Sequence, residues 1–385
     1  MTDRFADSAW CTDDHRSYSD LVERFVAAEV TPNSARWYEQ GAVDRELFEK
    51  AGALGILAPS LAENLGGGGL PRSFDALTCY EYARSGDTGW GIGIQQCVIH
   101  YIDDYGSPDQ KDRWLPGLAA GTTVAALAMS EPAAGSDLQG IRTTAKRTND
   151  GYSISGSKTF ITNGGMADIV CLVVKTDPDA RSRGISLMIV DLNDLDGFRR
   201  GGNLKKIGMK AQDTAELFFD EARVPADALL GGEEGRGFVQ MMEQLPWERL
   251  GVALLALGGI DYAVEETRAY ARDRKAFGKR LMDQQNIRFK LAECKTKAEV
   301  LRSFVADCIG RLDRGELDPA TASMAKWWSS QAQCEVADEC VQIFGGYGFM
   351  QDYGVARQYA DARVQKIYGG ANEIMKELIA RSLDY

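Results

Sequence analysis

Histidine and paired cysteines are scarce in this chain. It has only His15 and His100, and its eight cysteines include no Cys-x-x-Cys pair. Two histidines so far apart in the sequence, with no Cys-x-x-Cys pair, argue against a zinc site and a Ser-His-Asp triad. We expect no metal, and we expect any catalytic base to be a carboxylate. The scattered cysteines are typical of buried free thiols in a reducing compartment.

Long apolar runs and net positive charge are also missing. No stretch reaches the roughly 18 consecutive apolar residues of a membrane span. The N-terminus, MTDRFADSAWCTDDHRS, carries acids where a leader peptide avoids them. A net charge of -12 and a pI near 4.9 disfavour binding to nucleic acid. These features predict a cytoplasmic protein that binds neither membrane nor nucleic acid.

The spacing of apolar residues divides the chain into three parts. Residues 1–125 show the helical period, residues 126–235 alternate with the period of β-strands, and residues 236–385 return to long apolar helices. Long apolar helices need partners, which favours a four-helix bundle. The sequence therefore predicts an α+β protein with an all-α N-terminal domain, a central β domain and a C-terminal helical bundle.

The glycine-rich segments do not form a dinucleotide fingerprint. Gly66–Gly69 lacks the G-x-G-x-x-G spacing and a preceding strand, so we interpret it as a turn between helices. The segment AMSEPAAGSDLQGIRTTA (128–145) combines hydroxyls with glycine. It fits a polar surface turn or a loop that presents amides and hydroxyls to a ligand, and the turn is favoured when the segment is taken alone.

Three further segments allow both a structural and a functional interpretation. In KTFIT, Phe160 and Thr162 are predicted on one strand face, where they would flank a planar ring or simply reflect β-propensity. The basic cluster ARDRKAFGKRL (271–281) fits a solvated helix end or a phosphate site. In LPWERL, Pro246 and Glu248 fit the first turn of a helix, where an acid stabilises the N-terminus without chemistry.

Six segments together resemble the acyl-CoA dehydrogenases in order and spacing: MSEPAAGSD, KTFITNGG, LKKIGMKAQDTAELFFDEARVP, ARDRKAFGKRL, QIFGGYGF and IYGGANEIMKELIAR. The resemblance covers residues 17–385 and implies the same three-part fold, with a barrel or sandwich in the middle. It implies FAD held between the β domain and the bundle. It also implies a homotetramer whose neighbouring subunits complete each cofactor site.

The resemblance assigns cofactor contacts to two regions. Met129, Ser130, Phe160, Ile161 and Thr162 would lie against the flavin ring. Residues of the bundle would reach the rest of the cofactor: Arg274, Phe277, Gln285, Gln342, Gly345, Gly346, Ala371 and Glu373. Ala371 replaces a frequent threonine, while Phe160 and Ser130 replace a common Trp and Thr with residues of the same chemical class.

The expected position of the catalytic base also departs from the pattern of most family members. Most relatives carry the catalytic glutamate in a Y-E-G-T segment, where this chain has Gly369. In the long-chain and isovaleryl branches the carboxylate comes from the start of a bundle helix, and Glu248 matches that position. Gly369 or its neighbours would donate a backbone amide to the thioester carbonyl. Ser136, Arg249, Tyr368 and Gly370 are implied as substrate contacts.

The implied reaction is α,β-dehydrogenation of an acyl-CoA thioester. Glu248 would remove the C2 proton while a hydride leaves C3 for flavin N5, and an electron-transfer flavoprotein would accept the electrons. A dry pocket suits this base, because burial raises a carboxyl pKa toward neutrality. The alternatives are a dehydrogenase or oxidase acting on an acyl-carrier-protein thioester, and a non-catalytic flavin-binding protein.

Overall fold

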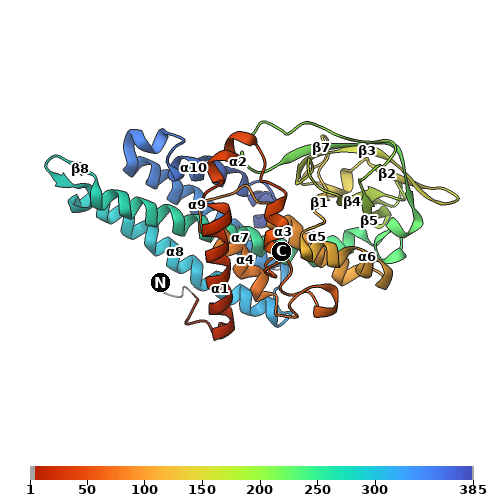
Figure 1. Ribbon diagram of the computed structural model, residues 1–385, viewed down its shortest axis with the longest axis horizontal. Coiled ribbons are helices and arrows are strands. Elements are labelled where there is room, and N and C mark those ends of the chain that lie inside the picture. Colours follow the sequence, from red (N-terminus) through yellow and green to blue (C-terminus); the bar gives the residue numbers. More distant parts are fainter. Residues whose placement is uncertain (1–4, 384–385) are drawn as a thin grey trace.

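The computed structural model describes residues 5–383. It begins with helices that pack side by side (Figure 1). These are α1 (Asp13–Phe25), α2 (Ser34–Gln40), α3 (Glu46–Gly52), α4 (Ser73–Ala83), α5 (Ile92–Tyr105) and α6 (Pro108–Ala120). The start of α6 is encoded locally: Ser107 accepts a hydrogen bond from the Gln110 amide, and Pro108 occupies the first helical position. The predicted turn at Gly66–Gly69 lies between a short 3-10 turn and α4, as expected.

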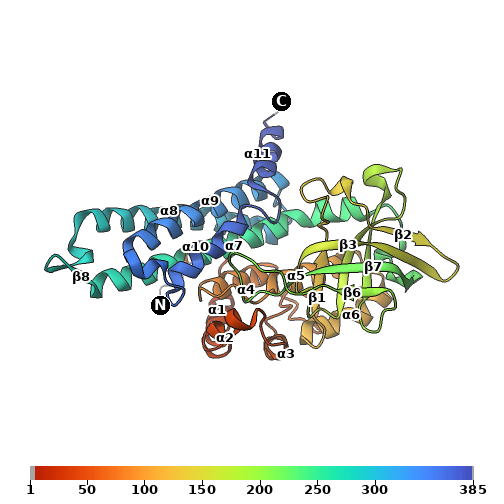
Figure 2. The same ribbon diagram turned by 90° about the horizontal axis from the view of Figure 1, so that it is seen from above.

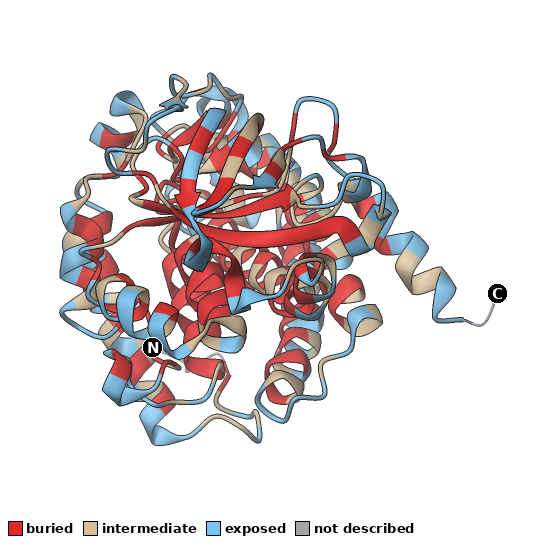
Figure 3. Cartoon of the chain, turned by 90° about the vertical axis from the view of Figure 1, so that its right-hand side faces the viewer, coloured by how far each residue is buried: buried red, intermediate tan, exposed pale blue. Residues whose placement is uncertain are grey.

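A seven-stranded mixed sheet follows, with the order β1-β4-β2-β3-β7-β6 and β5 paired to β4. Its strands are β1 (Ala125–Ala128), β2 (Thr144–Arg147), β3 (Gly151–Thr162), β4 (Ile169–Lys175), β5 (Ile185–Asp191), β6 (Phe198–Arg200) and β7 (Thr214–Pro225). All but the last residue of both β4 and β5 are buried. Buried residues make up much of the sheet in Figure 3. Burial on both faces explains why the residues of β4 and β5 are almost all apolar.

The C-terminal part is a helical bundle closed by a small hairpin. Its elements are α7 (Gly237–Asp273), β8 (Lys275–Ala276), β9 (Lys279–Arg280), α8 (Gln285–Asp313), α9 (Pro319–Phe344), α10 (Gly354–Gln365) and α11 (Asn372–Arg381). The hairpin lies at one end of the molecule and the sheet at the other, while α11 projects from the body (Figures 1 and 2). No helix within residues 5–383 is long and apolar enough to cross a membrane.

One expectation about α7 is wrong. The helix begins at Gly237, so Pro246 and Glu248 lie inside it and not in its first turn. The residues before Pro246 continue the apolar helical pattern, and their packing outweighs the backbone hydrogen bond that proline cannot donate. Glu248 therefore does not serve as a first-turn acid that stabilises a helix N-terminus.

The N-terminal helices and the bundle share one hydrophobic core. A single cluster of buried side chains includes Val22 and Leu47 from the first part and Leu254 and Val305 from the bundle. Buried polar groups connect the same elements. Arg302 of α8 donates to both carboxylate oxygens of Asp261 at 2.7 and 2.8 Å and to Tyr80 Oη at 2.7 Å. The helices of the two parts are therefore held together by both apolar and charged contacts.

Candidate active site

A buried tyrosine contacts the predicted base. Glu248 lies inside α7, and the Oη atom of Tyr101 on α5 donates a hydrogen bond to its Oε1 atom at 2.9 Å. Tyr101 is completely buried, whereas Glu248 retains partial exposure. Among the described residues, this is the one hydrogen bond recorded for the Glu248 carboxyl group. Its Oε2 atom is thus left for another partner.

The environment of Glu248 brings its pKa close to neutrality. Burial raises the pKa to about 7, while the hydrogen bond from Tyr101 and the charge of Arg249 act in the opposite direction. The thiols of Cys97 on α5 and Cys171 on β4 are the other titratable groups that interact with it electrostatically. A carboxyl group of this pKa is available both to accept and to release a proton near pH 7.

The segment around Gly369 packs against the same part of α7. Gly369 and Gly370 both have positive φ angles, 62° and 93°, between α10 and α11. A Cβ atom on Gly369 would lie 3.1 Å from Cγ2 of Val252, one helical turn after Glu248. The structure therefore brings Gly369 near the predicted base, at a position where glycine suits both the backbone and the space.

A buried lysine fixes this segment. Lys326 of α9 donates to the Gly370 carbonyl at 2.5 Å and to Oδ1 of Asn372 at 3.1 Å. Tyr368 has a buried Oη atom that finds no hydrogen-bond partner within residues 5–383. Ala371 precedes α11 without capping it, and Glu373 is exposed in the first turn of that helix.

Arg249 is directed to a different neighbour. Its Nη1 atom donates to Oγ of Ser323 on α9 at 3.2 Å, and its buried Nε atom has no hydrogen-bond partner among the described residues. Burial lowers the pKa of Arg249 against the raising effect of Glu248. Ser136, the other predicted substrate contact, is exposed in the loop between β1 and β2.

The predicted flavin contacts on the sheet lie close together. The Thr159 amide donates to the Ser130 carbonyl at 3.0 Å, which joins the segment after β1 to the end of β3. In the segment after β1, Met129 and Ser130 are half-buried. At the end of β3, Oγ1 of Thr162 donates to Oε1 of Gln212 at 3.3 Å.

Phe160 occupies an irregular position in β3. Its φ angle is +61°, and the register with β7 shifts between Lys158 and Ile161. The ring is 71% exposed, the neighbouring Ile161 is buried and Thr162 is half-buried. The two predicted ring contacts are thus more exposed than Ile161 between them. This arrangement arises from a bulge and a residue with left-handed backbone geometry, where a regular strand was expected.

Two residues beneath these contacts were not predicted. Nζ of Lys158 donates to the Met129 carbonyl at 3.1 Å and to Oε1 of Glu131 at 2.9 Å. Glu131 also accepts the amides of Arg142 and Thr143. Burial lowers the pKa of Lys158 to about 8 against the raising effect of Glu131. Glu131 stands in the motif SEPAAGSD and Lys158 in SKTFIT. These motifs were the sequence signal that could have identified the two residues.

The remaining predicted cofactor contacts lie at the hairpin end of the bundle. Arg274, Phe277 and Gln285 are exposed, and so are Gln342, Gly345 and Gly346 at the end of α9. The Arg274 guanidinium lies 5.6 Å from the ring centroid of Tyr347, which places the hairpin beside the segment after α9. This end is opposite the sheet (Figure 2), so one chain does not bring the two sets together.

The two sets fit the parts of FAD that the resemblance assigns to them. Phe160 presents an exposed flat ring beside amides and hydroxyls, as an isoalloxazine contact requires. Added Cβ atoms on Gly345 and Gly346 would meet no heavy atom within 4 Å, so their backbone is open to a ligand. Arg274 supplies a cation suited to phosphate.

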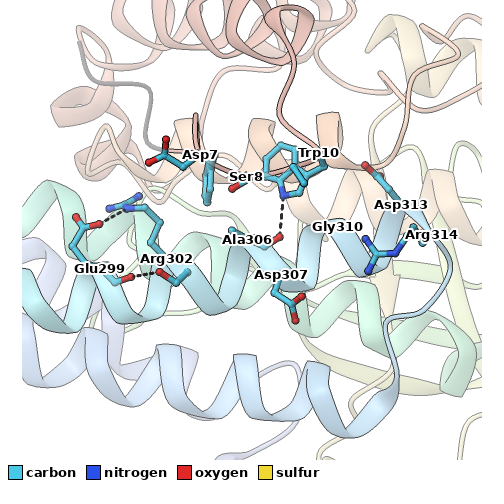
Figure 4. Close-up of a pocket in the computed structure, with 13 residues that line it drawn as sticks. Asp7, Ser8, Trp10, Glu299, Arg302, Ala306, Asp307, Gly310, Asp313 and Arg314 are labelled. Carbon is cyan, nitrogen blue, oxygen red and sulfur yellow. Dashed lines mark hydrogen bonds and ion pairs between the residues drawn. The ribbon is translucent and has the colours of Figure 1, made fainter.

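A cavity of about 590 Å³ lies elsewhere (Figure 4). It is lined by the segment from Phe5 to Trp10 and by one face of α8, and Nε1 of Trp10 donates to the Ala306 carbonyl beside it at 2.9 Å. It contains none of the predicted site residues. Within residues 5–383, no group of three or more His, Cys, Asp or Glu side chains is arranged to hold a metal ion.

Comparison with known proteins identifies the family. Residues 12–122, 126–222 and 235–383 match the N-terminal, middle and C-terminal domains of acyl-CoA dehydrogenase. The mitochondrial long-chain specific acyl-CoA dehydrogenase of Rattus norvegicus is 48% identical over 373 residues, which cover 96% of this chain and 86% of the relative.

Solved structures agree with the sequence comparison. The crystal structure of acyl-CoA dehydrogenase from Geobacillus kaustophilus superposes with a TM-score of 0.95 at 41% identity and covers 98% of this chain and 100% of its own. A chain in a structure described as the electron transferring flavoprotein of Acidaminococcus fermentans has a TM-score of 0.93 at 34% identity, with coverage of 97% and 98%. The chain belongs to the acyl-CoA dehydrogenases, a family of FAD-dependent oxidoreductases.

Proposed function

We propose that this protein introduces a 2,3 double bond into an acyl-CoA thioester, with Glu248 as the base that removes the C2 proton. The observation that carries the proposal is the state of Glu248: its pKa is raised to about 7 by burial, and its carboxylate is held by Tyr101. At neutral pH a substantial share of the carboxyl group is ionised.

The chain supplies the proton acceptor and the support for the carbonyl. Oε2 of Glu248, which Tyr101 leaves available, takes the proton from C2. Gly369 lies across from the next turn of α7, and backbone amides of its segment are suited to donate to the thioester carbonyl as negative charge develops there. FAD, when bound, supplies the acceptor for the hydride that leaves C3.

We also propose that two or more copies of the chain form each cofactor site, in a homotetramer. The separation of the two sets of contacts supports this: Phe277, which is 98% exposed, lies between β8 and β9, and this hairpin is at the opposite end of the molecule from β3, the strand that contains Phe160 (Figure 2). Sedimentation of the holoprotein tests the assembly. A stable monomer that retains FAD would overturn this part of the proposal.

The electron acceptor proposed is an electron-transfer flavoprotein, which the likeness to a chain in the Acidaminococcus fermentans structure supports. Rapid reoxidation of the reduced holoprotein by air alone would instead identify an oxidase. Slow reoxidation in air that an electron-transfer flavoprotein accelerates is the expected result.

Anaerobic titration of the yellow holoprotein with acyl-CoAs of different length and branching tests the reaction. The proposal predicts that one subset bleaches the visible flavin band and yields the 2-enoyl thioester. Bleaching by acyl-carrier-protein thioesters with no response to any CoA ester would reject CoA as the carrier. Absence of bleaching by either class would reject the reaction.

A further inference from the structure

The contact between Tyr101 and Glu248 joins two helices whose residues are far apart in the chain. Tyr101 lies on α5, which belongs to the N-terminal helices, and Glu248 lies on α7 of the bundle. The Tyr101 side chain is fully buried, and its hydroxyl donates to the partly buried Glu248 carboxylate at 2.9 Å. A hydrogen bond from a neutral donor to a carboxylate favours the ionised form of the acceptor and fixes its orientation.

We propose that Tyr101 is a positioning residue for the reaction: its hydroxyl holds Oε1 of Glu248, favours the ionised carboxylate and presents Oε2 to the substrate. This inference rests on the proposed role of Glu248 as the base. Helix α5 then does more than pack against α7, because Tyr101 on α5 influences the protonation state of the Glu248 carboxyl group on α7.

The phenol acts only as a donor. Burial raises the pKa of Tyr101 well above its ordinary value, and the neighbouring Glu248 charge raises it further. Tyr101 therefore keeps its proton throughout the pH range in which Glu248 titrates. It exchanges no proton with the substrate, and its effect reaches the reaction through the Glu248 carboxylate.

Two opposing influences then set the strength of the base. Burial favours the protonated carboxyl group and raises its pKa, whereas the Tyr101 hydrogen bond and Arg249 limit that rise to about 7. The other titratable groups facing Glu248 are the thiols of Cys97 and Cys171, whose pKa values burial raises, so they stay neutral near pH 7. Without Tyr101, a larger fraction of Glu248 would be protonated at pH 7.

The same two helices provide a matched control. Tyr105 lies one turn after Tyr101 on α5, and its Oη atom donates to Oε2 of Glu243 on α7, also at 2.9 Å. Glu243 is exposed and comes before Glu248 on α7, outside the proposed active site. Tyr105→Phe therefore removes an equivalent tyrosine-carboxylate bond between α5 and α7 without altering the contact to Glu248.

The test is the pH midpoint of Glu248 in Tyr101→Phe. The infrared band of the protonated carboxyl group, assigned by its loss in Glu248→Gln, gives this midpoint directly on the holoprotein. The proposal predicts an upward shift of about one pH unit, the size expected for a lost hydrogen bond to a charged group. The acidic limb of kcat/KM, which reports ionisations of the free holoprotein, should move by the same amount, and Tyr105→Phe should move neither.

Placing a difluorotyrosine at position 101 provides a second measurement that does not depend on removing the hydroxyl. Its phenol is a stronger donor, so the Glu248 midpoint should move downward. Unchanged midpoints in both Tyr101 variants would overturn the positioning role. Full turnover in Glu248→Gln would instead overturn the proposed base, and the two failures are therefore distinguishable.

Discussion

At the scale of single residues, Glu248 shows how one carboxyl group acquires a function from its surroundings. Its sequence context, LPWERL, resembles an ordinary helix start, and only the family resemblance pointed to Glu248 as a base. The raised pKa depends on the packing of α5 and β4 against α7, and the hydrogen bond depends on a residue 147 positions earlier. Such contacts are not readable from local sequence.

The titration of Glu248 predicts a pH-dependent stability difference. Because its pKa rises from 4.5 to about 7 on folding, the stability associated with protonated Glu248 is complete below pH 4.5 and is lost as the pH rises through 7. Glu248→Gln avoids this loss and should therefore raise Tm above pH 7 while having little effect near pH 4.5.

Thermal unfolding of both proteins across this pH range checks the prediction. Glu266→Gln, an exposed change on the same helix, should show no such dependence. A Tm difference between Glu248→Gln and the original protein that stays constant with pH would show that Glu248 is not desolvated on folding.

At the scale of elements, periodicity predicts the helices and strands but misses their irregularities. The apolar pattern of α7 was visible, yet Pro246 suggested a helix start where the structure has a helix interior. In KTFIT, Phe160 and Thr162 are more exposed than Ile161, but alternation gave no sign of the bulge or the positive φ angle of Phe160. Each irregularity is held by tertiary contacts that a local pattern does not contain.

The Lys158–Glu131 pair is expected to hold this part of the sheet in the shape that binds FAD. Lys158→Met removes the cation that links the Met129 carbonyl to Glu131 and leaves a buried carboxylate without its ion partner. The purified variant should retain less FAD, as measured by the ratio of visible to protein absorbance.

The control for this prediction is Lys146→Met, because Lys146 is exposed on the neighbouring strand β2. Equal FAD content in Lys158→Met and Lys146→Met would mean that the buried pair contributes nothing specific to the cofactor contacts.

At the scale of the whole molecule, the order of helical, β and helical segments was evident from the sequence because it depends on the period of the apolar residues. The way the parts join was not. Arg302, Asp261 and Tyr80 come from α8, α7 and α4, and nothing in their local sequences indicates that they meet in one buried network. The relation between the two sets of cofactor contacts likewise required the positions of β3 and the hairpin.

The buried network is predicted to stabilise the junction between the N-terminal helices and the bundle. Asp261→Asn removes the buried carboxylate partner of Arg302 and leaves it with the more exposed Glu299, which should reduce the free energy of unfolding by about 3 kcal/mol. Denaturant unfolding measures the change. Asp307→Asn removes an exposed partner of Arg311 on α8 and should cost at most about 1 kcal/mol. Equal losses in the two variants would contradict the assigned role of burial.

The most direct measurement of the central claim is the rate of flavin reduction in Glu248→Gln, mixed anaerobically with the best acyl-CoA substrate and compared with Glu243→Gln on the same helix. We expect Glu248→Gln to keep its fold and FAD but to reduce the flavin about 10²–10⁴-fold more slowly, the usual contribution of a general base. Glu243→Gln should react at the original rate. Near-normal flavin reduction in Glu248→Gln would contradict the assignment of Glu248 as the base.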